Sequence, residues 1–208
     1  LLRGLELDYM PGTERYTRQL LARYPMDFVI GSIHYVTVAN EPVVKVWELP
    51  RLAADSFLDK YFAQLEALLE SRLFDAVGHA DTLLRAIPED VFLRRFEPLI
   101  APLVRSGIAY ELNASGLRKS SLDPTTGKEI AGRWSYPSRA LLEKLLRNNV
   151  PLTIGSDAHD PRDAGAGIAE LVEVLRPLGL QSIGYYQQRQ RIDVLLDDLQ
   201  FHTVPASR

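Results

Sequence analysis

Short β-rich segments alternate with helical segments along most of this chain, and this alternation limits the folds that it can adopt. Strands are expected over residues 5–7, 28–33, 76–77, 108–112, 152–154 and 182–186. Helices are expected over 13–24, 52–73, 89–105, 138–148 and 163–178, in most of which apolar residues recur three and four positions apart. The pattern predicts an α/β fold with a parallel sheet and crossover helices. The polar stretch 120–134 is predicted to be a surface loop over the sheet.

The length and composition favour one soluble domain that spans residues 1–208. The formal net charge of −3 does not favour nucleic acid as a partner, because that would require a basic face. Apolar runs stay shorter than the ~20 residues of a membrane span, and no signal peptide is recognised, so the expected location is the cytoplasm. The chain has no cysteine, so any metal would be held by histidine and carboxylate ligands.

Polar residues of similar chemistry follow four of the expected strands. His34, His79 and Asn113 each stand at the end of one strand, and Asp157 with His159 follows another. In parallel α/β folds the carboxyl ends of the strands form the rim where sites are built. If these strands lie side by side, three of the four histidines converge on one rim, and we expect a metal site there. The fourth, His202, is expected to be exposed in the polar tail.

Five motifs follow one another in an order that resembles the histidinol-phosphatases of the PHP (polymerase and histidinol phosphatase) type. They are Gly-Leu-Glu-Leu-Asp-Tyr at 4–9, Val-Ile-Gly-Ser-Ile-His-Tyr at 29–35, Gly-His-Ala-Asp at 78–81, Glu-Leu-Asn-Ala-Ser-Gly-Leu-Arg at 111–118 and Gly-Ser-Asp-Ala-His at 155–159. The resemblance covers nearly the whole chain. It implies a distorted seven-stranded (β/α) TIM-like barrel that holds a cluster of up to three divalent ions, with Zn, Mn and Fe all compatible with such ligands.

The resemblance also implies an activity, which is the hydrolysis of L-histidinol phosphate to L-histidinol and phosphate in histidine biosynthesis. The implied metal ligands are Glu6, His34, His79, Asp157 and His159. The implied substrate-binding residues are Arg85, Asn113, Ser115 and Arg118, with the two arginines on the phosphate. Three groups are alternative candidates for the acid that protonates the leaving oxygen: Asp157, His159 and a metal-bound water.

The chemistry explains why such residues would be needed. A phosphate monoester dianion repels an attacking hydroxide, so its uncatalysed hydrolysis is extremely slow. Bound metal ions neutralise this charge and lower the pKa of water toward ~7. The planar guanidinium of arginine suits phosphoryl oxygens because it donates two parallel hydrogen bonds.

Some residues near these motifs have less specific interpretations. Asp8 alternates with apolar neighbours, as Glu6 does, and is expected to face solvent, whereas Glu6 is expected to be a ligand. Asp81 could orient His79 or be a surface residue. Asn113 and Ser115 could shape a turn instead of contacting the substrate.

One departure from the family pattern affects the expected activity. The family carries a His-x-His pair on its first strand and a further histidine after its second, and this chain begins in what would be the third. We therefore expect an N-terminally truncated domain that lacks the first one or two βα units, with exposed sheet edges and an impaired activity. Two alternatives stay open: another PHP phosphoesterase, acting on nucleotides or associated with a polymerase, and a non-catalytic module whose metal site has decayed. The oligomeric state is not predicted.

Overall fold

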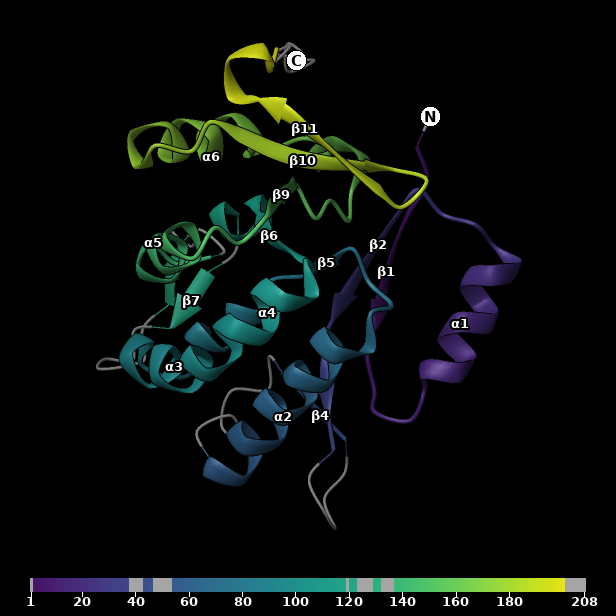
Figure 1. Ribbon diagram of the computed structural model, residues 1–208. Coiled ribbons are helices and arrows are strands. Elements are labelled where there is room, and N and C mark those ends of the chain that lie inside the picture. Colours follow the sequence, from purple (N-terminus) through teal and green to yellow (C-terminus); the bar gives the residue numbers. More distant parts are fainter. Residues whose placement is uncertain are drawn as a thin grey trace.

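The computed structural model describes residues 2–37, 43–46, 54–118, 120–122, 129–131 and 137–200 (Figure 1). Its main feature is a seven-stranded sheet with the order β1-β2-β5-β6-β9-β10-β11. The strands are β1 (Gly4–Asp8), β2 (Phe28–Ser32), β5 (Ala76–Val77), β6 (Ala109–Asn113), β9 (Leu152–Gly155), β10 (Ser182–Gln187) and β11 (Gln190–Leu195). All neighbours pair in parallel except β10 and β11, which form an antiparallel hairpin. The predicted α/β fold with a parallel sheet is confirmed.

Helices connect most of the parallel strands, and Figure 1 shows α2 to α5 packed along one side of the sheet. The α-helices are α1 (Glu14–Arg23), α2 (Asp55–Ser71), α3 (Glu89–Phe96), α4 (Ile100–Ser106), α5 (Arg139–Arg147) and α6 (Ile168–Leu175). Short 3₁₀ helices are η2 (Ala80–Arg85), η3 (Glu97–Leu99), η4 (Ala114–Leu117), η5 (Pro161–Asp163), η6 (Arg176–Leu178) and η7 (Leu196–Asp198). In α2, Phe57, Tyr61, Leu65 and Leu68 recur at helical spacing and are almost fully buried, so this face covers the sheet.

Two of the predicted helices are divided or shortened, each for a local reason. The helix expected over 89–105 is interrupted by η3, where Pro98 provides no N–H for the helical hydrogen-bond ladder. The helix expected from residue 163 begins only at Ile168. Gly165 and Gly167 precede it with φ of 79° and 81°, a left-handed conformation that a right-handed helix cannot contain.

Two small antiparallel pairs were not predicted. β3 (Tyr35–Val36) pairs with β4 (Val44–Lys45) just beyond the carboxyl end of β2. β7 (Ser120–Leu122) pairs with β8 (Glu129–Ala131), so the prediction of a plain loop over 120–134 is wrong for these residues. The pairing supplies backbone hydrogen bonds that the polar composition of the stretch did not reveal. The other positions of that stretch, and His202, lie outside the described residues.

The β10–β11 hairpin brings the far end of the sheet back toward its first strands. Its two turn residues, Gln188 and Arg189, have φ of 50° and 65°, as the tight turns of hairpins require. Their backbone N–H groups donate to the Asp27 side chain at 3.0 Å and to the Asp27 carbonyl at 2.9 Å. The Arg189 guanidinium also pairs with Asp75 at 2.6 Å. The sheet is therefore curved like a barrel wall, and Figure 1 shows the hairpin tip beside the start of β1 and β2.

The turn contacts Asp27, just before β2, and Leu73, shortly before β5, so the carboxyl ends of these two strands lie away from it. The register pairs Glu6 with Ile30 and Asp8 with Ser32, while Gly31 lies opposite Val77 on the next strand. The residues that follow β2 and β5 are thereby placed at the same rim as the end of β1. Within the described residues, no helix is both long and apolar enough to cross a membrane.

Candidate metal centre

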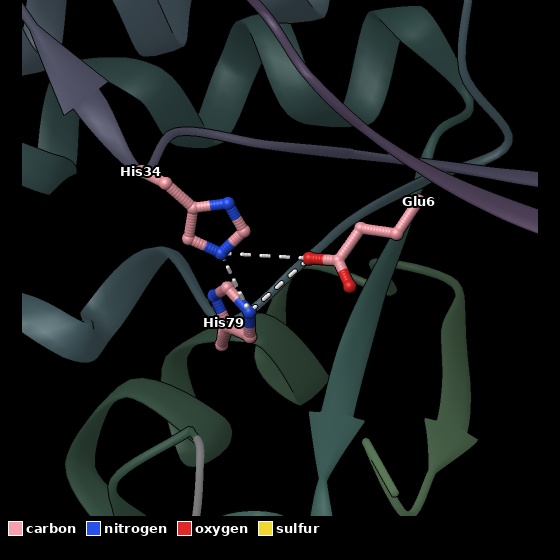
Figure 2. Close-up of side chains that lie close together, drawn as sticks. All are labelled: Glu6, His34 and His79. Atoms are coloured by element: carbon pink, nitrogen blue, oxygen red, sulfur yellow. Dashed lines mark hydrogen bonds and ion pairs between the residues drawn. The ribbon is translucent and has the colours of Figure 1, made fainter. Parts of the chain in front are cut away.

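Three of the predicted ligands meet at this rim, as Figure 2 shows. Glu6 comes from β1, His34 follows β2 and His79 follows β5. The Glu6 Oε1 atom lies 3.6 Å from His34 Nε2 and 3.3 Å from His79 Nε2, and the two Nε2 atoms are 3.4 Å apart. Ligands bound tetrahedrally at ~2.0–2.1 Å from a zinc ion lie ~3.3–3.5 Å from each other. The triangle is therefore the right size to hold one divalent ion.

Close approach of the strands fixes the carboxylate of this triangle. Ser32 Oγ donates a hydrogen bond of 2.6 Å to Glu6 Oε1. A Cβ atom on Gly78 would clash with Ser32 Oγ, so glycine is needed where β5 ends. The sequence thus places a small residue before His79 and a hydroxyl beside Glu6, and together they orient the ligand set.

Electrostatics makes this triangle attractive to a cation. Burial by itself would raise the pKa of Glu6, but hydrogen bonds from His79 and Ser32 and the charges of the two histidines lower it to about 2. Burial would lower the pKa of His79, yet the Glu6 hydrogen bond and the charges of Glu111, Glu6 and Asp157 raise it. The site is therefore anionic around its histidines, and an incoming metal ion takes the place of a proton.

Asp157 and His159 have different environments. The Asp157 side chain is 7% exposed and accepts a hydrogen bond of 2.8 Å from Ser115 Oγ at Oδ2. Its φ of 47° turns the chain sharply just after β9. The His159 side chain is 83% exposed, with Nδ1 3.5 Å from Asp157 Oδ1. Neither belongs to the group of three residues that meet within ligand distance, so their roles as ligands stay predictions.

Asn113, Ser115 and Arg118 stand at or just after the carboxyl end of β6, at the same rim, and are differently engaged. Arg118 donates to the backbone carbonyls of Ser156 at 2.6 Å and Ala166 at 3.1 Å, so its guanidinium braces the loop that carries Asp157. Arg85 lies at the end of η2, and its buried Nε atom has no hydrogen-bond partner among the described residues.

Asn113 and Ser115 form part of the turn that follows β6. Asn113 is fully buried, and its Oδ1 atom accepts from the Ser115 N–H at 2.9 Å. The side chain of Asn113 therefore shapes the turn that presents Ser115 to Asp157. Asp81 is fully buried and accepts from Tyr110 and from the Ser138 N–H, so its interpretation as a surface residue is wrong.

Glu111 belongs to the site but was missed by the sequence reasoning. Its Oε2 atom accepts from the His79 N–H at 3.2 Å and from Asn113 Nδ2 at 3.1 Å. Burial raises its pKa, against the opposing effects of His79 and Asn113. The available signal was a lone carboxylate in the middle of an otherwise neutral strand, 109–113, where every residue is buried. Buried charges of this kind are uncommon unless they are paired.

A curved, mostly parallel sheet with candidate histidine and carboxylate ligands at its carboxyl rim is typical of the class of metal-binding TIM-like barrels. The sequence model of the PHP domain matches residues 1–115, and this chain belongs to the PHP domain family. That match spans β1 to the turn after β6 and contains Glu6, His34 and His79. The predicted family is confirmed.

Two curated relatives share most of the chain. It is 28% identical over 194 residues to the "Probable histidinol-phosphatase" of Deinococcus radiodurans. This alignment covers 90% of this chain and 68% of that protein. It is 23% identical over 193 residues to the protein of the same name from Schizosaccharomyces pombe. This second alignment covers 88% of this chain and 61% of the relative. The chain thus spans about two thirds of the length of these relatives.

A solved structure has the same fold. The histidinol phosphate phosphatase of Lactococcus lactis, crystallised with Zn, L-histidinol and phosphate, superposes with a TM-score of 0.65 at 16% identity. The superposition covers 90% of this chain and 70% of that one. The predicted distorted barrel fold is thereby confirmed, whereas the loss of one or two βα units stays a prediction.

Proposed function

We propose that this protein is a metal-dependent phosphomonoesterase that hydrolyses L-histidinol phosphate to L-histidinol and phosphate. The observation that carries the proposal is the triangle of Glu6, His34 and His79, whose ligand atoms are spaced as a single divalent ion requires. The names of the two relatives and the ligands of the Lactococcus lactis structure support this choice of substrate. The substrate is then a small phosphate ester, and the family's pathway would be histidine biosynthesis.

When bound, divalent ions supply Lewis-acid stabilisation of the phosphoryl oxygens and a more acidic water. Zn, Mn and Fe all suit the His and carboxylate ligands. In this proposal Glu6, His34 and His79 hold one ion. Asp157, which is already oriented by Ser115, adds a carboxylate at the same rim. His159 stays a candidate ligand and a candidate proton donor to the leaving oxygen, because it is exposed beside Asp157.

The arginines are proposed to bind the phosphate. Arg85 offers a buried Nε donor that lacks a hydrogen-bond partner among the described residues, and a phosphate oxygen would satisfy it. Arg118 now holds two backbone carbonyls near Asp157. A dianionic phosphate competes well for this guanidinium because charge-assisted hydrogen bonds are about twice as strong as neutral ones. Arg118→Ala is expected to raise KM more than it lowers kcat, and unchanged kinetics would remove Arg118 from the site.

The test is phosphate release by the metal-loaded protein from L-histidinol phosphate, p-nitrophenyl phosphate, glycerol phosphate and adenosine monophosphate. We expect kcat/KM for L-histidinol phosphate to exceed the others at least about tenfold, a difference of ~1.4 kcal/mol in transition-state binding. A preference for the nucleotide would favour the other class of PHP phosphoesterase. Release from none of the esters by protein that retains its metal would indicate a non-catalytic module.

His34→Ala is the matched loss-of-site variant for this assay. It removes one ligand from the triangle and is expected to abolish turnover. The control is Arg94→Ala, which breaks only an exposed pair with Asp90 on α3 and is expected to leave turnover unchanged. Turnover by His34→Ala equal to that of the original protein would contradict the proposal.

A further inference from the structure

Asp8, the last residue of β1, contacts the first histidine of the metal centre at two points. Its Oδ1 atom accepts a hydrogen bond of 2.8 Å from the backbone N–H of His34. The same oxygen lies 3.1 Å from His34 Nδ1. Asp8 was predicted to face solvent, and its side chain is indeed 35% exposed. The two contacts nevertheless tie Asp8 to the backbone and to the ring of one residue.

The two ring nitrogens of His34 face different groups. Nδ1 faces Asp8, whereas Nε2 faces His79 and Glu6, at 3.4 Å and 3.6 Å. A neutral imidazole carries its hydrogen on one nitrogen and a lone pair on the other. A carboxylate can only accept, so it favours the hydrogen on Nδ1 and leaves the lone pair on Nε2. That lone pair is then directed into the triangle where the ion would bind.

Strand geometry explains how β1 supplies both a metal ligand, Glu6, and a residue that contacts another ligand, Asp8. Side chains two positions apart on a strand project from the same face, so Glu6 and Asp8 share one face of β1. Glu6 forms one corner of the triangle. Asp8 lies two residues further along β1, opposite Ser32 on β2, and contacts the His34 ring at Nδ1, the nitrogen that faces away from the triangle. Asp8 therefore cannot replace Glu6 as a ligand, but it can hold the ring that completes the set.

We propose that Asp8 is a positioning residue of the metal centre, which fixes the orientation of His34 and holds it in the tautomer whose Nε2 binds the ion. This inference rests on the proposed function, because it presupposes that the triangle of Glu6, His34 and His79 holds a metal. Carboxylates that accept from the second nitrogen of a metal-binding histidine typically change metal affinity 10- to 100-fold when they are removed.

The first test measures the zinc dissociation constant by competition with a chromophoric chelator for the original protein and for three variants. Asp8→Ala removes the acceptor and is expected to weaken zinc binding about 10- to 100-fold. Asp8→Asn retains an amide oxygen that can accept from Nδ1 and is expected to restore most of the affinity. Asp90→Ala, an exposed carboxylate on α3, is the matched control and is expected to bind as the original protein does.

The outcomes separate the inference from the proposed function. Failure of the original protein itself to bind zinc would refute the metal centre. If the original protein binds zinc and Asp8→Ala binds it equally tightly, the centre stands and the role of Asp8 is overturned. Asp8→Asn binding as weakly as Asp8→Ala would also overturn the role as a hydrogen-bond acceptor.

A second readout needs neither activity nor a variant that folds. Nitrogen-15 NMR of metal-free protein with labelled histidine reports which ring nitrogen of His34 carries the hydrogen. We expect the hydrogen on Nδ1, under conditions where the ring is neutral. A neutral ring with its hydrogen on Nε2 would overturn the inference, even if Asp8→Ala proved unstable.

Discussion

His79 shows how a single residue couples metal binding to pH. Its pKa is raised in the folded protein, so a proton stays on the imidazole to a higher pH than usual and competes with the metal. Zinc affinity should therefore fall as pH falls through this raised pKa, by roughly tenfold per pH unit if one proton is displaced. Calorimetry in two buffers of different ionisation enthalpy measures the proton released. An affinity that is the same at about pH 6 and about pH 8 would contradict this expectation.

The hydroxyl of Ser115 is expected to matter through Asp157. Ser115→Ala removes the 2.8 Å hydrogen bond to a carboxylate that is only 7% exposed, at a cost to stability of about 1 kcal/mol. The looser carboxylate should lower kcat roughly tenfold. Ser106→Ala is the control, because that hydroxyl donates to the Leu103 carbonyl and accepts from the Ile108 N–H just before β6, at the opposite end of this strand from Ser115. An unchanged kcat for Ser115→Ala would show that Asp157 does not depend on this bond.

For individual residues, the sequence predicted the candidate ligands better than it predicted the contacts that hold them. His34 and His79 could be selected because each stands just after a strand, whereas Glu6 was selected because its motif resembles that of the PHP family. The two contacts of Asp8 depend on the register of β1 with β2, which no local pattern specifies. Glu111 was missed because it lies inside a strand, where an apolar residue is the usual choice.

Close packing of neighbouring elements leads to a prediction for β2. A Cβ atom on Gly31 would lie 2.6 Å from the ring of Phe74, which packs just before β5. Gly31→Ala is therefore expected to destabilise the fold by about 1–3 kcal/mol, as overpacking of a core does. Gly4→Ala on β1 is the control, since its Cβ would be 3.7 Å from the nearest atom, an ordinary contact. Urea denaturation measures both, and equal stability of the two variants would argue against this packing.

The elements themselves were largely predictable where the pattern is local. Each of the six expected strands overlaps an observed one, and the apolar spacing of 52–73 marks α2. β11 was not expected, because 190–195 contains Arg191 and Asp193 and lies at an edge with exposed positions. The β3–β4 and β7–β8 pairs are short and depend on partners distant from any periodic signal. The sheet order likewise follows from long-range packing.

The curvature of the whole molecule depends on the ties between the β10–β11 turn and the early strands. Arg189 pairs with Asp75 and donates to the Leu73 carbonyl at 2.7 Å. Arg189→Ala leaves the 8% exposed Asp75 carboxylate without this partner. Because Arg189 is itself one-third exposed, the expected loss is about 1–3 kcal/mol, less than for a fully buried pair.

The exposed ion pair of Arg94 and Asp90 also provides the control for the ion pair of Arg189 and Asp75. Arg94→Ala should leave the denaturation midpoint within experimental error, because surface pairs contribute little. A midpoint for Arg189→Ala that is equally unchanged would mean that the hairpin turn does not hold the curved sheet together.

The most direct test of the account is the dependence of phosphate release on the metal supplied to metal-free protein. L-histidinol phosphate is offered at saturation, and zinc or manganese is added stepwise while the released phosphate is measured. We predict no release without metal and an increase that levels off once the site of Glu6, His34 and His79 is filled. The same increase should be absent from His34→Ala. Equal release with and without metal, or none from protein with its metal bound, would contradict the account.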